Sequence, residues 1–169
     1  MCFYSRLRIA AFSHRARAPV VRPNFAGHPQ AEYDRLDGVV SSSVGYTGGT
    51  AANPTYKTVC KGDGHTEAVR LVFDPKVLSY EELIRRVLSE ASSHKSKAQY
   101  MSAVWAQDEQ QAAAAKRAAS ELRKSGVPIL EAKQTEWYEA EEYHQKYVAK
   151  SKGSGTCGLA ATISKFGSL

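Results

Sequence analysis

Two spacings of hydrophobic residues recur along this chain, one typical of strands and one of helices. Val39–Gly45 is a run of β-branched and small residues, and Ala68–Phe73 is apolar on both faces, so we predict a strand at each. Ser79 is expected to cap a helix that continues to about Ala91. The apolar residues of this helix fall on one side, as expected of a face that covers a sheet: Leu83, Ile84, Val87 and Leu88.

Shorter patterns predict the remaining elements. A short helix over Gln30–Leu36 precedes the first strand, and a loop rich in turn residues follows that strand over residues 46–58. Further along we predict strands at Ala103–Trp105 and Ile129–Lys133, an alanine-rich helix at Gln110–Lys124 and a helical stretch at Trp137–Tyr147. Strands interspersed with helices favour an α+β domain, in which a mixed sheet and packed helices form two layers.

The length and composition fit one globular domain. The chain has 169 residues, of which 43% are hydrophobic, and no apolar run approaches the roughly 20 residues that span a bilayer. A membrane-spanning protein is therefore excluded. The net charge is +6, but residues 1–31 hold five arginines and no acidic residue, so residues 32–169 carry only +1. This distribution disfavours binding of nucleic acid by a folded basic face. Binding through the arginine-rich end alone would depend on salt.

The arginine-rich beginning of the chain differs from the rest. We expect residues 1–23 to be a basic extension, either disordered or a transit peptide, and residues 24–169 to form the domain. A transit peptide would direct the protein to a plastid or a mitochondrion; otherwise we expect it in the cytoplasm. Three cysteines, Cys2, Cys60 and Cys157, give no paired framework, so a disulfide-stapled secreted scaffold is disfavoured.

One acidic residue is a candidate for proton transfer. Glu67 begins the second predicted strand beside the glycine-rich loop, where burial would raise the pKa of its carboxyl group and make it a proton donor. Tyr56 ends the same loop, so its phenol can donate a hydrogen bond into the same space. Tyr100 precedes another predicted strand. Any one of these tyrosines alone fits a structural aromatic residue, so function is inferred from the combination.

Other chemistries for this region lack residues that they require. His65-Thr66-Glu67 is similar to the His-x-Glu of zinc deaminases, but the Pro-Cys-x-x-Cys that completes such a site is absent. Cys60 and His65 supply two metal ligands, whereas a structural site needs about four. The Gly-x-Ser-x-Gly elbow of Ser/His/Asp hydrolases is absent as well. We therefore expect neither a metal site nor a hydrolase.

Several motifs, in one order, resemble a single enzyme family. They lie between about Gly38 and Gly158: Gly45-Tyr46-Thr47-Gly48-Gly49, Asn53-Pro54-Thr55-Tyr56, Val59-Cys60, Gly64-His65-Thr66-Glu67-Ala68-Val69, Phe73-Asp74-Pro75 and Ala140-Glu141-Glu142-Tyr143-His144-Gln145-Lys146-Tyr147. The set is similar to the MsrA family of peptide-methionine (S)-S-oxide reductases. The resemblance implies the family's ferredoxin-like α+β roll, a monomer, and no metal or organic cofactor.

The resemblance also implies a reaction and a role for each matching residue. In this family a cysteine thiolate attacks the sulfur of methionine-S-sulfoxide, free or in a peptide, and a glutamate that corresponds to Glu67 protonates the departing oxygen. Tyr56 and Tyr100 correspond to the tyrosines that hold this oxygen. The sulfenic acid that forms is converted by a second cysteine into a disulfide, which thioredoxin reduces. Cys157 matches this resolving cysteine, whereas Cys60 matches a family cysteine that is not the nucleophile and is interpreted as a small apolar residue.

The family's nucleophile is the main difference. The family carries it in Gly-Cys-Phe-Trp-Gly, about a dozen residues before the position of Gly38, where this chain has Asn24-Phe25-Ala26. Cys2, followed by Phe3 and Tyr4, is the only similar string, and it lies about two dozen residues too early. An extended linker would bring Cys2 to the site at roughly 3.3 Å per residue, but a thiol on a long tail lacks a fixed geometry for attack.

Three hypotheses account for the missing thiol. Cys2 acts as the nucleophile, or the gene encodes a selenocysteine before Gly38 whose codon was skipped as a stop, or the domain binds methionine-containing or oxidised peptides without turnover. A thiol within reach of Glu67 would distinguish a reductase from a binding protein. Differences near Tyr100 concern the same question, because Met101 replaces a family arginine and Lys95 stands near an expected aspartate.

Overall fold

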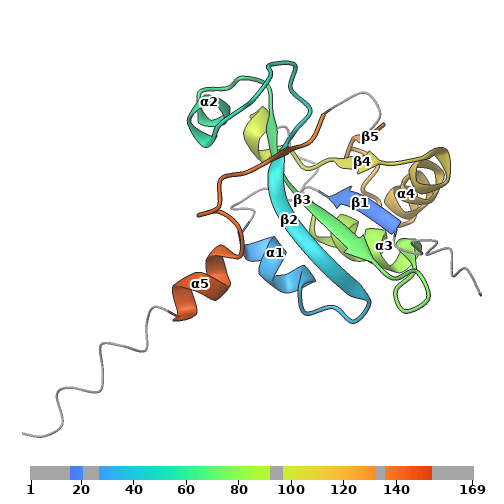
Figure 1. Ribbon diagram of the computed structural model, residues 1–169. Helices are drawn as coiled ribbons and strands as arrows, with labels where there is room; N and C mark the ends of the chain where they lie inside the picture. The colour runs from blue at the N-terminus through green and yellow to red at the C-terminus, as the bar shows by residue number, and fades with distance from the viewer. Residues whose placement is uncertain (1–15, 21–26, 92–96, 132–135, 154–169) are drawn as a thin grey trace, which may run out of the picture.

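A six-stranded sheet forms the centre of the protein (Figure 1). The computed structural model describes residues 16–20, 27–91, 97–131 and 136–153. Along the sheet the order is β5-β4-β1-β3-β2-β6, and every pairing is antiparallel except that of β4 with β5. The mixed sheet predicted from the sequence is confirmed. The strands are β1 (Ala16–Val20), β2 (Val39–Thr47), β3 (Thr66–Phe73), β4 (Val104–Ala106), β5 (Ile129–Glu131) and β6 (Tyr138–Glu139).

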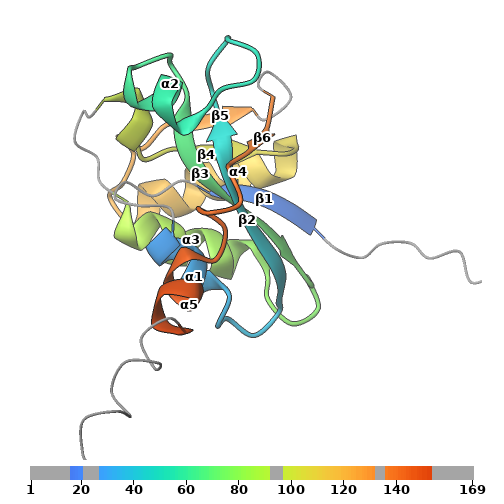
Figure 2. The same cartoon turned by 60° about the vertical axis from the view of Figure 1, so that its left-hand side comes forward.

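Helices complete the α+β architecture. Helix α3 packs against α4, helix α4 contacts β4 and β5, and α1 contacts β2 and α5. Figures 1 and 2 show α2 at one end of the sheet and the pair α1 and α5 toward the other. In the described part of the chain no helix is both long and apolar enough to cross a membrane. The helices are α1 (Gly27–Tyr33), α2 (Tyr56–Cys60), α3 (Tyr80–Glu90), the 3-10 helix η1 (Ala98–Tyr100), α4 (Glu109–Glu121) and α5 (Tyr147–Gly153).

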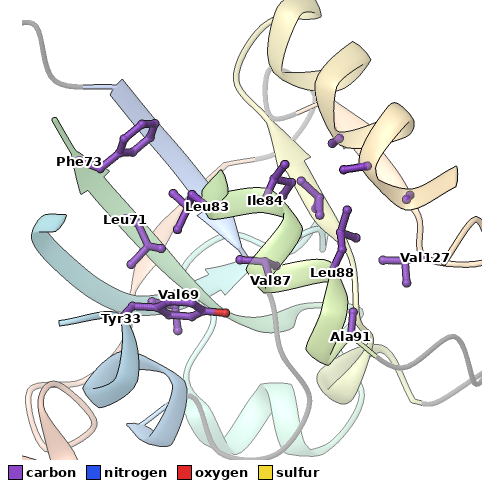
Figure 3. Packing of buried hydrophobic residues seen from close by; sticks show 14 of the residues in the cluster. Tyr33, Val69, Leu71, Phe73, Leu83, Ile84, Val87, Leu88, Ala91 and Val127 are labelled. Atoms are coloured by element: carbon purple, nitrogen blue, oxygen red, sulfur yellow. The ribbon is translucent and has the colours of Figure 1, made fainter. Parts of the chain in front are cut away.

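Strand β3 is buried along one face and over its first half on the other, so the predicted burial on both faces holds in part. Val69, Leu71 and Phe73 alternate along the strand and belong to the main hydrophobic cluster, which α1 and α3 also line (Figure 3). Ala68 points to the opposite face and packs with Ala103 and Trp105. Burial of one large aliphatic side chain stabilises a fold by about 1.5–3 kcal/mol, so the buried residues of β3 contribute substantially to the stability of the core.

Helix α3 covers the sheet with the apolar face that the sequence predicts. The Ser79 hydroxyl accepts a hydrogen bond from the Glu82 N–H at 3.2 Å, which satisfies a free amide of the first turn. The buried residues of α3 are Leu83, Ile84, Val87 and Leu88, and Figure 3 shows them between β3 and α4. Helix α4 contributes small side chains to this contact: Ala114, Ala115, Ala118 and Ala119.

Strand β1 corrects one expectation. Residues 16–20 pair with β3 from Ala16 opposite Phe73 to Val20 opposite Val69, and Val20 also lies opposite Val104 of β4. These residues belong to the sheet and not to an unstructured extension. Without β1 the backbone groups of β3 that face β4 would have no ladder partner, so a strand is required there. Backbone pairing needs no alternation of side chains, which is why residues 16–20 gave no strand signal.

The stretch from residue 137 to residue 147 also differs from its predicted structure. It is not helical as predicted: β6 is followed by turns, and α5 begins only at Tyr147. The Gln145 side chain accepts a hydrogen bond from Val44 N–H at 2.9 Å and donates one to Val44 C=O at 2.7 Å, while Ala140 N–H donates to the same carbonyl at 3.0 Å. These bonds to β2 hold the segment along the sheet and override its helical spacing.

Candidate active site

Three segments that are distant in sequence meet at one end of the sheet. Both ribbon views show α2, η1 and the start of β3 together there (Figures 1 and 2). The Thr66 hydroxyl donates to Ala98 C=O at 2.7 Å and joins β3 to η1. Helix α2 was not predicted, because its first residues fall in the loop expected over residues 46–58. It begins at a capping box in which Thr55 and Thr58 exchange hydrogen bonds. The start of each segment is thereby fixed.

Glu67 is the acidic group of this region. Its side chain is half-buried, and in the ladder Glu67 lies opposite Tyr46 of β2, so both side chains leave the sheet on the same face. The Gln99 amide donates a hydrogen bond to Glu67 Oε1 at 2.7 Å. Gln99 itself is buried in η1, so the carboxyl group is oriented by a neighbour that has little freedom to move.

Tyr56 lies next to Glu67 and Tyr100. A hydrogen bond with the Cys60 thiol, burial, and the negative charge of Glu67 raise the pKa of Tyr56 to about 12. The phenol therefore keeps its proton at neutral pH and is available as a hydrogen-bond donor. Its ring packs on the His144 ring with a centroid distance of 4.7 Å. Tyr100, at the end of η1, has 39% of its surface exposed and lies at the solvent side of this group.

A second carboxylate, that of Glu141, forms hydrogen bonds with two tyrosines. Glu141 accepts a hydrogen bond from the Tyr46 hydroxyl at 2.6 Å and another from Tyr56 N–H at 2.9 Å. Burial alone would raise the pKa of Glu141, but these donated hydrogen bonds outweigh it and hold the pKa below its usual value. Glu141 lies in one of the motifs that resemble the family, but the sequence predicted no role for it. Glu141 fixes the first residue of α2, which is Tyr56.

Comparison with known proteins places the chain in a family. A family model described as peptide methionine sulfoxide reductase matches residues 28–166. This chain belongs to that family. A peptide methionine sulfoxide reductase MsrA of Ectopseudomonas mendocina is 42% identical over 141 residues, which are 74% of this chain and 64% of the length of that protein. The chain thus spans less than two thirds of the length of this relative.

Two solved structures share the fold. Methionine sulfoxide reductase A of Corynebacterium diphtheriae superposes with a TM-score of 0.71 at 25% identity and covers 94% of this chain and 85% of its own. Mxr1 from Saccharomyces cerevisiae in complex with Trx2 superposes with a TM-score of 0.51 at 19% identity, over 79% of this chain and 84% of its own. The expected ferredoxin-like roll of the MsrA family is confirmed.

The structure brings together three of the residues that the family resemblance singled out. Tyr56 begins α2, Glu67 lies near the start of β3 and Tyr100 ends η1, the three segments that meet at one end of the sheet. Cys2 and Cys157 lie outside the described residues, as does the stretch at residues 24–26 where the family carries its nucleophile. Gln99, Glu141 and His144 complete the surroundings of the site: Gln99 binds Glu67, Glu141 binds Tyr56, and His144 packs on the Tyr56 ring.

Cys60 differs from its interpretation as a small apolar residue. It is exposed at the end of α2 and takes no place in the hydrophobic core. Gln99 Nε2, which donates to Glu67, also lies 3.2 Å from the Cys60 sulfur. The thiol thus shares one amide with the acid of the site.

His65 belongs to the loop framework of the reductase fold. It is buried, its Nδ1 lies 3.0 Å from Asp63, and its ring meets the edge of Tyr138. A Cβ on Gly49 would stand 2.3 Å from this ring, so the loop needs glycine at that position to pass over His65. The described residues contain no group of three or more His, Cys, Asp or Glu side chains suited to a metal ion. His65 serves packing in this loop.

Proposed function

We propose that this chain reduces methionine-S-sulfoxide, free or in a peptide, to methionine. One observation carries the proposal: in a member of the peptide methionine sulfoxide reductase family, a half-buried carboxyl group and two tyrosines from separate segments converge at one end of the sheet. A sulfoxide oxygen leaves poorly until it gains a proton, so its reduction needs a positioned acid with hydrogen-bond donors beside it. Glu67, Tyr56 and Tyr100 supply that combination.

Each group takes a distinct part in the proposed reaction. Glu67 donates the proton to the departing oxygen, and Gln99 keeps its carboxyl group in place. Tyr56 and Tyr100 donate hydrogen bonds to this oxygen before and during its departure. The raised pKa of Tyr56 suits this part, because the hydroxyl keeps its proton throughout the neutral range.

The oxidised enzyme requires a thiol reductant. We propose a thioredoxin-like dithiol, with Cys157 as the resolving cysteine that forms the disulfide which this partner reduces. The yeast protein Mxr1, which shares the fold, has been solved in complex with Trx2. That complex supports a partner of the same class for this chain.

The missing family cysteine at residues 24–26 favours a second function. Without a thiol in reach, the same groups would bind an oxidised methionine side chain through its oxygen and release it unchanged. Such a protein would bind peptides that contain methionine sulfoxide and would form no methionine.

Turnover with separated sulfoxide epimers tests the proposal. We expect thioredoxin-coupled reduction of the S epimer and no reduction of the R epimer, and we expect Glu67→Gln to lower kcat at least 100-fold, the scale of a lost proton donor. Glu109→Gln, at an exposed position of α4, is the matched control and should leave kcat unchanged. Epimer-selective binding by a parent protein that forms no methionine would support the binding function and overturn the reductase.

A further inference from the structure

Three exposed lysines lie on the two segments that carry the tyrosines of the proposed site. Lys57 follows Tyr56 in α2, and Lys61 is the C-cap residue of the same helix. Lys97 is the N-cap residue of η1, the segment that ends at Tyr100. The border of the site therefore carries three positively charged side chains that solvent can reach.

Side-chain contacts bring these two segments to one place. The Gln99 amide in η1 lies 3.2 Å from the sulfur of Cys60, the residue before Lys61, and donates a hydrogen bond to Glu67 Oε1 at 2.7 Å. Lys97 stands two positions before Gln99. Exposed charges act over roughly 10 Å at 0.1 M salt. The lysines of α2 and of η1 therefore act on the same ligand when it is bound beside Glu67.

The carboxylates of this region have partners inside the protein. Asp63 Oδ1 accepts a hydrogen bond from His65 N–H at 2.9 Å and lies 3.0 Å from His65 Nδ1. Glu141 is bound to two tyrosines, and Glu142 Oε1 lies 2.8 Å from Lys150 Nζ. By contrast, none of the three lysines forms a hydrogen bond or an ion pair with another described residue. Their charges are thus available to a ligand.

An uncharged aromatic ring lies on the same border. Tyr143 is 59% exposed, and its ring packs on the His144 ring with a centroid distance of 4.2 Å. Burial and the charges of Glu141 and Cys60 raise the pKa of Tyr143, so its hydroxyl keeps its proton at neutral pH. The ring offers apolar contact to a bound peptide and adds no negative charge that would offset the lysines.

We infer that the protein selects methionine sulfoxide in acidic stretches of polypeptide, an inference that rests on the proposed function. Lys57, Lys61 and Lys97 would bind aspartate or glutamate side chains on either side of the oxidised residue. Complementary charges at the rim of an interface speed association and orient the partner. The lysines act on binding and take no part in the transfer of the oxygen.

The overall charge favours a peptide over a longer polyanion. Residues 32–169 carry a net charge of only +1, so the lysines form a local positive border and not a broad basic face. A nucleic acid gains affinity from many phosphate contacts at once. A short acidic segment that is held at its centre by the sulfoxide fits three lysines better.

Binding of three matched peptides tests the inference. Each has one central methionine-S-sulfoxide, and the residues on both sides of it are Asp, Asn or Lys. Affinity is measured by fluorescence anisotropy with the full chain carrying Glu67→Gln, without reductant, so that the peptides stay oxidised. We expect the acidic peptide to bind on the order of 10-fold more tightly than the neutral one, the scale of three exposed ion pairs. In about 0.5 M salt the ratio should fall to about 2-fold or less, because mobile ions screen exposed charges.

Neutral substitutions assign the preference to the lysines. On the same background, Lys57→Gln/Lys61→Gln/Lys97→Gln should bind the acidic and the neutral peptide with affinities that agree within about 2-fold. The affinity for the neutral peptide should equal that of the chain with its lysines. This second value shows that the sulfoxide site itself is intact.

A matched control removes the same charge at other exposed positions. Lys76 lies in the turn before α3, Arg86 in α3 and Lys116 in α4. The variant with glutamine at these three positions should keep the preference for the acidic peptide. Loss of the preference in this control would assign it to net charge and overturn the role of the lysine border.

Turnover makes the same comparison in the parent. In thioredoxin-coupled reduction, we expect the acidic peptide to have the lower KM and both peptides to share one kcat, because the lysines act only in binding. Equal affinities in the binding experiment together with equal kcat/KM would leave the reductase standing and overturn the inference. A preference that survives in the lysine variant would overturn it as well.

The remaining outcomes separate the inference from the proposed function. If the parent forms no methionine but its acidic preference depends on the lysines, the reductase is overturned and the inference holds for the binding function. If no peptide binds and none is reduced, both are overturned. Equal displacement of the acidic peptide by an oligonucleotide of the same charge would identify a general anion-binding surface and contradict selection of acidic peptides.

Discussion

Gln99 and Glu67 are joined by a hydrogen bond of 2.7 Å, although 32 positions separate them in the chain. Glu67 is the second residue of β3 and Gln99 lies in η1, so the site depends on the docking of these two segments. Thr66, next to Glu67, secures that docking by its bond to Ala98 C=O. The acid is thus oriented by tertiary structure and not by its own strand.

Removal of the Gln99 amide should disturb the acid without removing it. We expect Gln99→Ala to lower kcat about 10- to 100-fold, the usual cost when the supporting group of a catalytic residue is lost, with little change in KM. Gln110→Ala, exposed on α4, is the control and should change neither quantity. A kcat of Gln99→Ala equal to that of the parent would contradict the orienting role.

Loss of the Tyr56 hydroxyl should slow the reaction. Tyr56→Phe removes one donor to the oxygen, and we expect kcat to fall roughly 10²–10³-fold, as for other donors that stabilise a developing charge. Because the pKa of Tyr56 is about 12, this phenol should cause no decline of kcat in the parent between pH 7 and pH 10. Tyr147→Phe, at an exposed position of α5, serves as control. Equal rates for both variants would remove Tyr56 from the mechanism.

The lowered pKa of Glu141 predicts a pH-dependent contribution to stability. The unfolded chain holds the Glu141 proton more tightly than the folded protein does, so the charged carboxylate stabilises the fold above its unfolded pKa, and this contribution is lost as pH falls through the lower folded pKa. Glu141→Gln should therefore cost about 1 kcal/mol at pH 7 and less at pH 3. Denaturant unfolding followed by tryptophan fluorescence measures both values. An equal cost at both pH values would show that charge is not the cause.

The packing of α3 predicts a large effect at its centre. Ile84 has no exposed surface and belongs to the main cluster, so Ile84→Ala should reduce the free energy of unfolding by about 2–5 kcal/mol. Arg86→Ala, on the exposed side of the same helix, should change it by less than about 0.5 kcal/mol. Both variants are compared by urea denaturation at pH 7. Similar losses in the two would contradict the assignment of the buried face.

The elements that the sequence predicted well are those whose signals are local. The apolar run of β3 and the cap and apolar face of α3 depend on neighbouring residues, and both were placed within one or two residues. The convergence of Tyr56 and Tyr100 on Glu67 followed from family motifs, because no local pattern relates residues so far apart. The same limit explains why Gln99, whose partner lies on another segment, had no signal in the sequence.

The failures have physical causes of the same kind. Strand β1 pairs with the backbone of β3 and β4, which need a hydrogen-bond partner between them. The side chains of residues 16–20 show no pattern that would predict this pairing. The segment over residues 137–147 has helical spacing, but Gln145 reaches Val44 with both atoms of its amide. Helix α2 was not predicted because Asn53-Pro54 is a strong turn signal, whereas a single threonine at position 55 is a weaker signal for the start of a helix.

The short outer strands of the sheet limit how copies of the protein can associate. The outermost strands are β6, with two residues, and β5, with three, and beyond β6 the Gln145 amide occupies the next backbone positions of β2. Within the described residues, both borders offer only short rows of backbone amide and carbonyl groups, so the addition of a strand from a second molecule is disfavoured there. By pairing with Val44, the Gln145 amide thus closes a stretch of β2 to which another strand could otherwise add.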